Sequence, residues 1–189
     1  MSIELDTKNA FQSFFVRSIG IADYVWLTKN VKSPSVADLN GGFQKRFNSF
    51  YVVRRNEDWK KDFYDVFDTV IHNRKKQSFK SILKSLSSKP NITWCEPSFS
   101  SKMLATINPD MPIWDDNVLS NLNLKAEWAR KQHDTDNAVQ IYEKICNWYK
   151  EYLSSDAANS NIEMFDSILP DYTFISKVKK IDYILWCMR

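Results

Sequence analysis

Glycine is scarce in this chain, with only three glycines among its 189 residues. Phosphate-binding loops and tight hairpin turns depend on glycine, because a residue without a side chain adopts left-handed backbone conformations at little steric cost. The scarcity therefore argues against a Gly-rich phosphate loop and against a fold rich in β-hairpins.

Reactive and metal-binding residues are also few. The three cysteines, Cys95, Cys146 and Cys187, have neither CxxC nor Cys/His spacing, and they are too few for a Cys₄ iron–sulfur centre. Their odd number fits a reducing compartment. The two histidines, His72 and His133, have no metal or catalytic-triad partner at a recognisable spacing. We therefore expect no metal ion and no cofactor.

Long apolar runs are missing as well. No segment approaches the roughly 20 apolar residues that cross a membrane. The first residues include Glu4 and Asp6 and lack the apolar core of a signal peptide. We therefore expect a cytoplasmic protein with no membrane partner. The formal net charge of +3 is too small to indicate nucleic acid by itself.

Apolar and aromatic residues, in contrast, are plentiful. The chain is 43% hydrophobic and 14% aromatic, which is enough for a packed core. Apolar residues recur three and four positions apart over 57–73, 78–87 and 134–153, the spacing of amphipathic helices. No segment alternates clearly enough to predict a sheet. We predict an all-α fold, a compact bundle of about eight to ten helices, forming a single domain over 1–189.

Two segments are predicted to connect helices. Residues 32–42 include the turn Asn40-Gly41-Gly42 and are the best candidate for a boundary between two lobes. Residues 154–161 are polar and are predicted to form a loop. Residues 43–55 mix aromatic and basic side chains and allow two interpretations: a half-buried helix, with Val52-Val53 as a short strand in one version, or a face for a phosphate-bearing partner.

Basic residues gather in one part of the chain. Between Thr69 and Cys95 there is no acidic residue, whereas six lysines and arginines occur there. A segment with charge of one sign is a plausible footprint for a phosphate backbone, although most short basic runs are ordinary solvated faces. The candidate phosphate-binding cations are Arg54, Arg55, Arg74, Lys75 and Lys76.

The stretch from Ser98 to Asp115 predicts two helices joined by a turn. Ser98 is placed to cap the first helix, and Asn108-Pro109 ends it, because the residue before proline is pushed out of the helical region. Asp115 is placed to cap the second helix. The pattern sets Lys102 at the edge of a buried helical face and holds the Asp115 carboxylate at a helix start.

Within this stretch, Ser101-Lys102-Met103-Leu104 and then Pro112-Ile113-Trp114-Asp115-Asp116-Asn117-Val118 resemble a group of uncharacterised bacterial proteins. Those proteins look like distant relatives of the helix-hairpin-helix DNA glycosylases, particularly the 8-oxoguanine DNA glycosylase fold. In that family a lysine opens the second hairpin helix, and a Pro-x-Asp segment places an aspartate at the start of the next helix. The segments Phe50-Tyr51-Val52-Val53-Arg54-Arg55 and Ile181-Asp182-Tyr183-Ile184-Leu185-Trp186 are part of the same resemblance, which covers the middle of the chain well and its ends loosely.

The resemblance implies a base-excision-repair function, with DNA as the partner. Lys102 matches the lysine nucleophile and Asp115 matches the catalytic aspartate of a DNA N-glycosylase or abasic-site lyase. The family's Gly-x-Gly turn, which binds a DNA phosphate, is replaced here by Pro97-Ser98-Phe99-Ser100-Ser101. The hydroxyls of Ser98, Ser100 and Ser101 and the helix start are the expected substitutes. The expected walls of a pocket for an extruded base are Trp94, Phe99 and Trp114.

Each of these residues also has an ordinary structural interpretation. Lys102 can extend from a helix edge toward solvent, Asp115 can serve only as a cap, and the tryptophans can belong to the core. Two other functions therefore stay open: a non-catalytic nucleic-acid-binding module, and a protein-interaction domain whose contact surface is the aromatic segment 43–51.

Overall fold

The structure is a computed structural model, and it describes residues 19–31 and 42–188. Within these ranges it is helical throughout and contains no strand, which confirms the all-α prediction. The predicted connector over 32–42 lies outside the described residues except for Gly42, which begins a helix. None of the described helices is long and apolar enough to span a bilayer.

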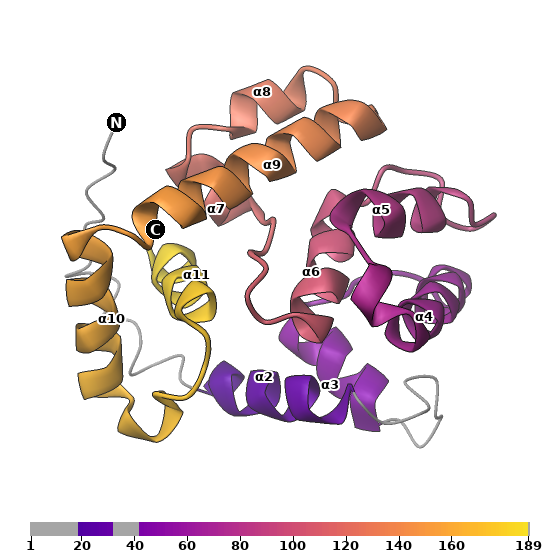
Figure 1. The fold of residues 1–189 in the computed structure, drawn as a ribbon. Coiled ribbons are helices and arrows are strands. Elements are labelled where there is room, and N and C mark those ends of the chain that lie inside the picture. Colours follow the sequence, from indigo (N-terminus) through magenta and orange to yellow (C-terminus); the bar gives the residue numbers. More distant parts are fainter. Residues whose placement is uncertain (1–18, 32–41, 189) are drawn as a thin grey trace.

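Ten α-helices and two short 3₁₀ helices follow one another along the described chain. The α-helices are α2 (Ile19–Asn30), α3 (Gly42–Phe50), α4 (Glu57–His72), α5 (Phe79–Ser87), α6 (Pro97–Ile107), α7 (Asp116–Asn121), α8 (Lys125–Ala129), α9 (Thr135–Tyr152), α10 (Asp156–Ile168) and α11 (Lys177–Cys187). The 3₁₀ helices are η1 (Arg74–Lys76) and η2 (Pro170–Tyr172). In Figure 1, α4 and α5 lie on one side of α6 and α10 and α11 on the other, while α8 and α9 lie above them, with one end of α9 near α5.

Several predicted helix starts are confirmed by their caps. Ser78 accepts a hydrogen bond from the backbone N–H of Ser81 and completes a capping box, and Asp134 caps α9. The prediction for Ser98 is wrong, because α6 begins one residue earlier, at Pro97. Proline suits the first helical position, since its missing N–H would have no partner there anyway.

Two other local predictions are corrected. The segment 154–161 is not a loop, because α10 starts at Asp156 behind the cap Ser155 and buries Ala158 and Ile162. Val52-Val53 is not a strand: Val52 follows the end of α3 with φ of 53°, a left-handed conformation that is rare for a β-branched residue.

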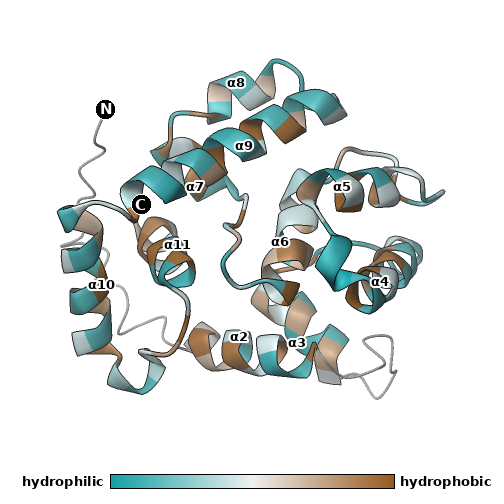
Figure 2. Cartoon of the chain, viewed as in Figure 1, coloured by the Kyte–Doolittle hydropathy of each residue, from teal (hydrophilic) through white to brown (hydrophobic). Residues whose placement is uncertain are grey.

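The buried apolar side chains form one contiguous core that draws on helices from α2 to α11. Burial of this kind is the main favourable term in folding. Figure 2 shows α6 and α11 as largely apolar, while α9 and α10 present more hydrophilic residues. The site described below lies where α6 and α11, the two inner helices, approach the link between α6 and α7.

Candidate active site

Lys102 and Asp115 stand on either side of the turn between α6 and α7. Lys102 lies in the middle of α6, and Asp115 caps α7 by accepting a hydrogen bond of 2.9 Å from the backbone N–H of Val118. The turn is fastened on both sides, because Tyr142 on α9 donates to the carbonyl of Pro112 and Ser176 at the start of α11 donates to that of Pro109. Tertiary contacts therefore fix the position of Asp115 relative to α6.

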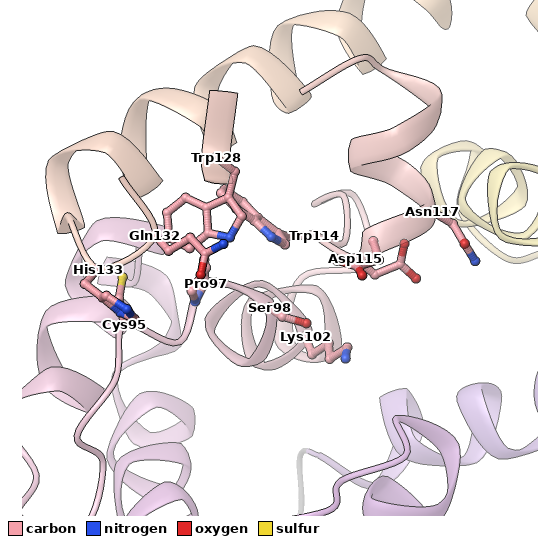
Figure 3. A pocket seen from close by; sticks show the side chains of 11 residues that line it. Cys95, Pro97, Ser98, Lys102, Trp114, Asp115, Asn117, Trp128, Gln132 and His133 are labelled. Carbon is pink, nitrogen blue, oxygen red and sulfur yellow. The ribbon is translucent and has the colours of Figure 1, made fainter. Parts of the chain in front are cut away.

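Two cavities meet at this pair of side chains. The first, here called the polar cavity, has a volume of about 430 Å³ and runs from Lys102 and Asp115 past Trp128 to His133. Figure 3 shows Lys102 and Asp115 at one end of it and His133 with Cys95 at the other. The second, here called the aromatic cavity, has a volume of about 410 Å³. Among the described residues, Lys102 and Asp115 are the two that line both cavities.

The aromatic cavity collects side chains from five helices, α2, α3, α6, α7 and α11, and from the turn. Its walls are Phe50 and Tyr51 at the end of α3 and Tyr183 and Trp186 on α11, together with apolar residues of the turn and α7. Its size lies within the roughly 300–1,000 Å³ of small-molecule sites, which are mostly apolar with a few polar groups. The charged groups that line it are two lysines and three aspartates, an unusual concentration in so apolar a place.

Lys102 is largely removed from water. Its Nζ lies over the rings of Phe99 and Tyr51, at 5.0 and 5.7 Å from their centroids. Burial lowers the pKa of Lys102 because the charged form loses its hydration; Asp115 exerts the strongest opposing effect, and the nearby Lys179 lowers the pKa further. Lys102 forms no ion pair with any carboxylate of the described residues. An amine in this setting gives up its proton more readily than a solvated lysine.

Lys179 and Asp182 are functional candidates that the sequence reasoning missed. Both lie on α11, both are about 5% exposed, and their charged ends are 3.8 Å apart on the wall of the aromatic cavity. Burial raises the pKa of Asp182 to about 6 and lowers that of Lys179. A sequence signal existed, since three charged residues, Lys179, Lys180 and Asp182, stand among the apolar residues of 178–187.

The serines of α6 have different surroundings from those the resemblance implies. Ser100 and Ser101 are fully buried, and their hydroxyls donate to the carbonyls of Glu96 and Ser98. Ser101 also accepts a hydrogen bond from the N–H of Trp114, which ties α6 to the turn. Both hydroxyls are thus used inside the protein, and the phosphate-binding role predicted for them does not fit. Ser98 alone faces the polar cavity.

The three aromatic residues predicted to form a base pocket are not brought together. Phe99 packs in the core against Trp59, and Trp114 packs between Phe79 and Trp128 while lining the polar cavity. Trp94 is exposed and lies against His133, at 4.5 Å between ring centroids. The aromatic walls beside Lys102 are instead those of the aromatic cavity.

The predicted phosphate-binding cations fall into two groups. Arg55 forms an ion pair of 2.8 Å with the buried carboxylate of Glu96, so it has a structural partner. Four others, Arg54, Arg74, Lys75 and Lys76, are exposed and make no ion pair with any described residue. The segment between Thr69 and Cys95 contains no acidic residue, but acidic residues from other helices lie beside it. Lys80 is 3.9 Å from Asp136, and Lys89 is 3.6 Å from Asp65.

The described residues offer neither a metal-binding cluster nor a reactive thiol at the polar cavity. They contain no group of three or more histidine, cysteine and acidic side chains placed to hold a metal ion. Burial raises the pKa of Cys95, at the edge of the polar cavity, to about 11, so this thiol stays protonated near neutral pH.

The chain was also compared with known proteins. The comparisons with protein-family models, with curated proteins and with solved structures each found no match.

Proposed function

We propose that this protein is a DNA glycosylase with lyase activity, in which Lys102 is the nucleophile and Asp115 assists it. One observation carries the proposal: Lys102 and Asp115 line the same two adjoining cavities, one largely apolar, the other more polar and more open. The proposal also draws on the resemblance of the α6–turn–α7 segment to helix-hairpin-helix glycosylases. An extruded base would occupy the aromatic cavity, and the strand would pass along the polar one.

The proposed reaction requires an amine with a free lone pair. The lone pair on Nζ of Lys102 forms a bond to the sugar carbon C1′ while the bond from C1′ to the base breaks, and the base leaves with that electron pair and takes up a proton. Asp115 stabilises the positive charge on the sugar and accepts the proton that Nζ then loses. The lone pair left on Nζ then forms a second bond to C1′ while the bond from C1′ to the ring oxygen O4′ breaks, and O4′ takes the proton from Asp115, which opens the sugar ring and gives a protonated imine between Nζ and C1′.

Borohydride trapping tests this proposal directly. The full chain is mixed with duplexes that carry an abasic site, 8-oxoguanine or another damaged base, and borohydride reduces any imine to a stable protein–DNA adduct. We expect an adduct with the wild type and none with Lys102→Gln. Lys180→Gln is the matched control, because Lys180 is a buried lysine that faces Asp166 instead of the cavities. The absence of an adduct across the whole set of lesions would overturn the proposal.

The exposed cations support a second candidate, a nucleic-acid-binding module without catalysis. Arg74, Lys75 and Lys76 form the exposed 3₁₀ turn η1 and lack ion pairs with the described residues. This candidate predicts duplex binding that weakens steeply with salt, and a smaller salt dependence when all three are changed to glutamine. Lys80→Gln together with Lys89→Gln is the control, since those lysines already face acids. Binding that does not respond to salt would exclude it.

A further inference from the structure

Two amines face the aromatic cavity, and their surroundings differ. Lys179 lies 3.8 Å from Asp182, and its Nζ is surrounded by the rings of Tyr24, Tyr183 and Phe50 at 4.7, 5.0 and 5.6 Å. Lys102 touches the rings of Phe99 and Tyr51 and has no carboxylate in ion-pair contact among the described residues. A carboxylate and aromatic faces both favour the charged form of an amine. The contacts of Lys179 therefore favour a charged amine more than the contacts of Lys102 do.

The carboxylate beside Lys179 is held in place. Tyr149 on α9 donates a hydrogen bond to one oxygen of Asp182, and the other oxygen faces Lys179 without a hydrogen-bond partner. Asp182 is ionised above its raised pKa of about 6. The charged carboxylate favours the ammonium form of Lys179, whose side chain lies on the wall of the cavity that Lys102 also lines.

The other carboxylates near Lys102 already have partners. Glu96, which precedes α6, is paired with Arg55 at 2.8 Å, and Asp116 on α7 lies 3.3 Å from Lys125. Asp115 accepts a hydrogen bond at the start of α7. On the far wall, Asp23 of α2 is paired with Arg46 at 2.9 Å. The nearby tyrosines, Tyr24, Tyr51 and Tyr183, are neutral because burial raises their pKa values.

From this arrangement we propose that Lys179 is a positioning residue whose ammonium, anchored by Asp182, makes the amine of Lys102 on the same cavity wall easier to deprotonate. Two like charges on the wall of one desolvated cavity repel each other, and the amine without an ion-pair partner is the one that releases its proton more readily. The assignment of Lys102 as the nucleophile rests on the proposed function. The electrostatic coupling between the two amines does not, and it can be measured without a substrate.

The test is competitive acetylation of the full chain with acetic anhydride across pH 6–11, read by mass spectrometry on the peptide that contains Lys102. Acetylation reports the fraction of neutral amine and so gives an apparent pKa. We expect that of Lys102 to rise by about one unit or more in Lys179→Met and Lys179→Gln, because the repelling charge is gone. Lys179→Arg, which keeps the charge, should leave it within a few tenths of the wild-type value.

The matched control is Lys180→Met. Lys180 is the next residue on the same helix, is equally buried and is paired with Asp166 at the side away from the cavity. Its loss perturbs α11 without removing a charge from the cavity, so the pKa of Lys102 should not change. Two neutral substitutions at position 179 are used so that poor folding of one leaves the other to decide.

The inference is overturned if the pKa of Lys102 is the same in the neutral variants as in the wild type, or if Lys179→Arg shifts it as much as they do. Borohydride trapping at a series of pH values separates this result from the proposed function. A shift in the apparent pKa of Lys102 without any trapped DNA supports the coupling between the amines and refutes the proposed glycosylase function. Trapping that occurs with no acetylation shift overturns the role of Lys179 and leaves Lys102 as the nucleophile.

Discussion

The hydroxyl of Tyr149 donates a hydrogen bond to the carboxylate of Asp182 in the interior of the protein. Tyr149 is 2% exposed and Asp182 5%, so neither group has water as an alternative partner. Through this contact the long helix α9 fixes the carboxylate that faces Lys179 on α11. A hydrogen bond to an ionised group is stronger than one between neutral groups, and its loss leaves a buried charge poorly satisfied.

Tyr149→Phe should therefore destabilise the fold by about 1–3 kcal/mol, as expected when a buried charged acceptor loses its donor. Tyr142→Phe is the matched control, because Tyr142 lies on the same helix and donates to a neutral acceptor, the carbonyl of Pro112, at 2.8 Å. Urea denaturation at pH 7 measures the stability of both variants. Equal losses of stability would show that the charge of Asp182 adds nothing to the strength of the hydrogen bond from Tyr149.

The stability of the protein should depend on pH through Asp182. Its folded pKa of about 6 lies above its ordinary value of 3.8, so the folded state holds the proton more tightly than the unfolded chain. The resulting stabilisation is fully present below about pH 4 and is lost as the pH rises through 6. We expect the stability of the wild type relative to Asp182→Asn to fall by roughly 2–3 kcal/mol between pH 4 and pH 7.

Urea denaturation of both proteins at several pH values provides this comparison. The asparagine variant keeps an oxygen for Tyr149 and lacks the titrating group, so other carboxyl groups, including Glu96 with its raised pKa, cancel in the difference. A difference that stays constant with pH would contradict the assignment.

Substitutions at Asp115 separate its two roles. Asp115→Ala removes the cap of α7 and should cost about 1 kcal/mol, whereas Asp115→Ser keeps a capping oxygen and should cost only a few tenths. Both remove the carboxylate from the cavities, so both should reduce borohydride trapping strongly. Thermal denaturation measures the loss of stability, and the amount of protein–DNA adduct measures the trapping. Normal trapping by Asp115→Ser would leave the aspartate with a capping role alone.

Arg55 and Arg54 are neighbours with different expected roles. Arg55→Met leaves the buried carboxylate of Glu96 without its partner and should cost about 1–3 kcal/mol. Arg54 is exposed and forms no ion pair with the described residues, so Arg54→Met should change stability by less than about 0.5 kcal/mol. If Arg54 contacts a phosphate, its variant should instead weaken duplex binding. The reverse pattern, with Arg54 the more important for stability, would contradict this assignment.

Most helices were predictable because their causes are local. The apolar positions of α4, α5 and α9 recur at helical spacing, and the caps Ser78, Asp115 and Asp134 act on backbone groups two to three residues ahead. The start of α10 was missed because its polar residues obscured a buried face that consists there of Ala158 and Ile162. Short apolar patterns carry little signal until a neighbouring helix covers them.

The sequence by itself determined most of the helices and most of their caps, since these depend on residues close together in the chain. Only the tertiary structure decided which ionisable groups share a cavity. Lys179 and Asp182 are more than sixty positions from Asp115, and they face it because α11 packs against α7 and beneath α9. Electrostatic coupling acts through space in a desolvated interior, so no spacing along the chain can predict it.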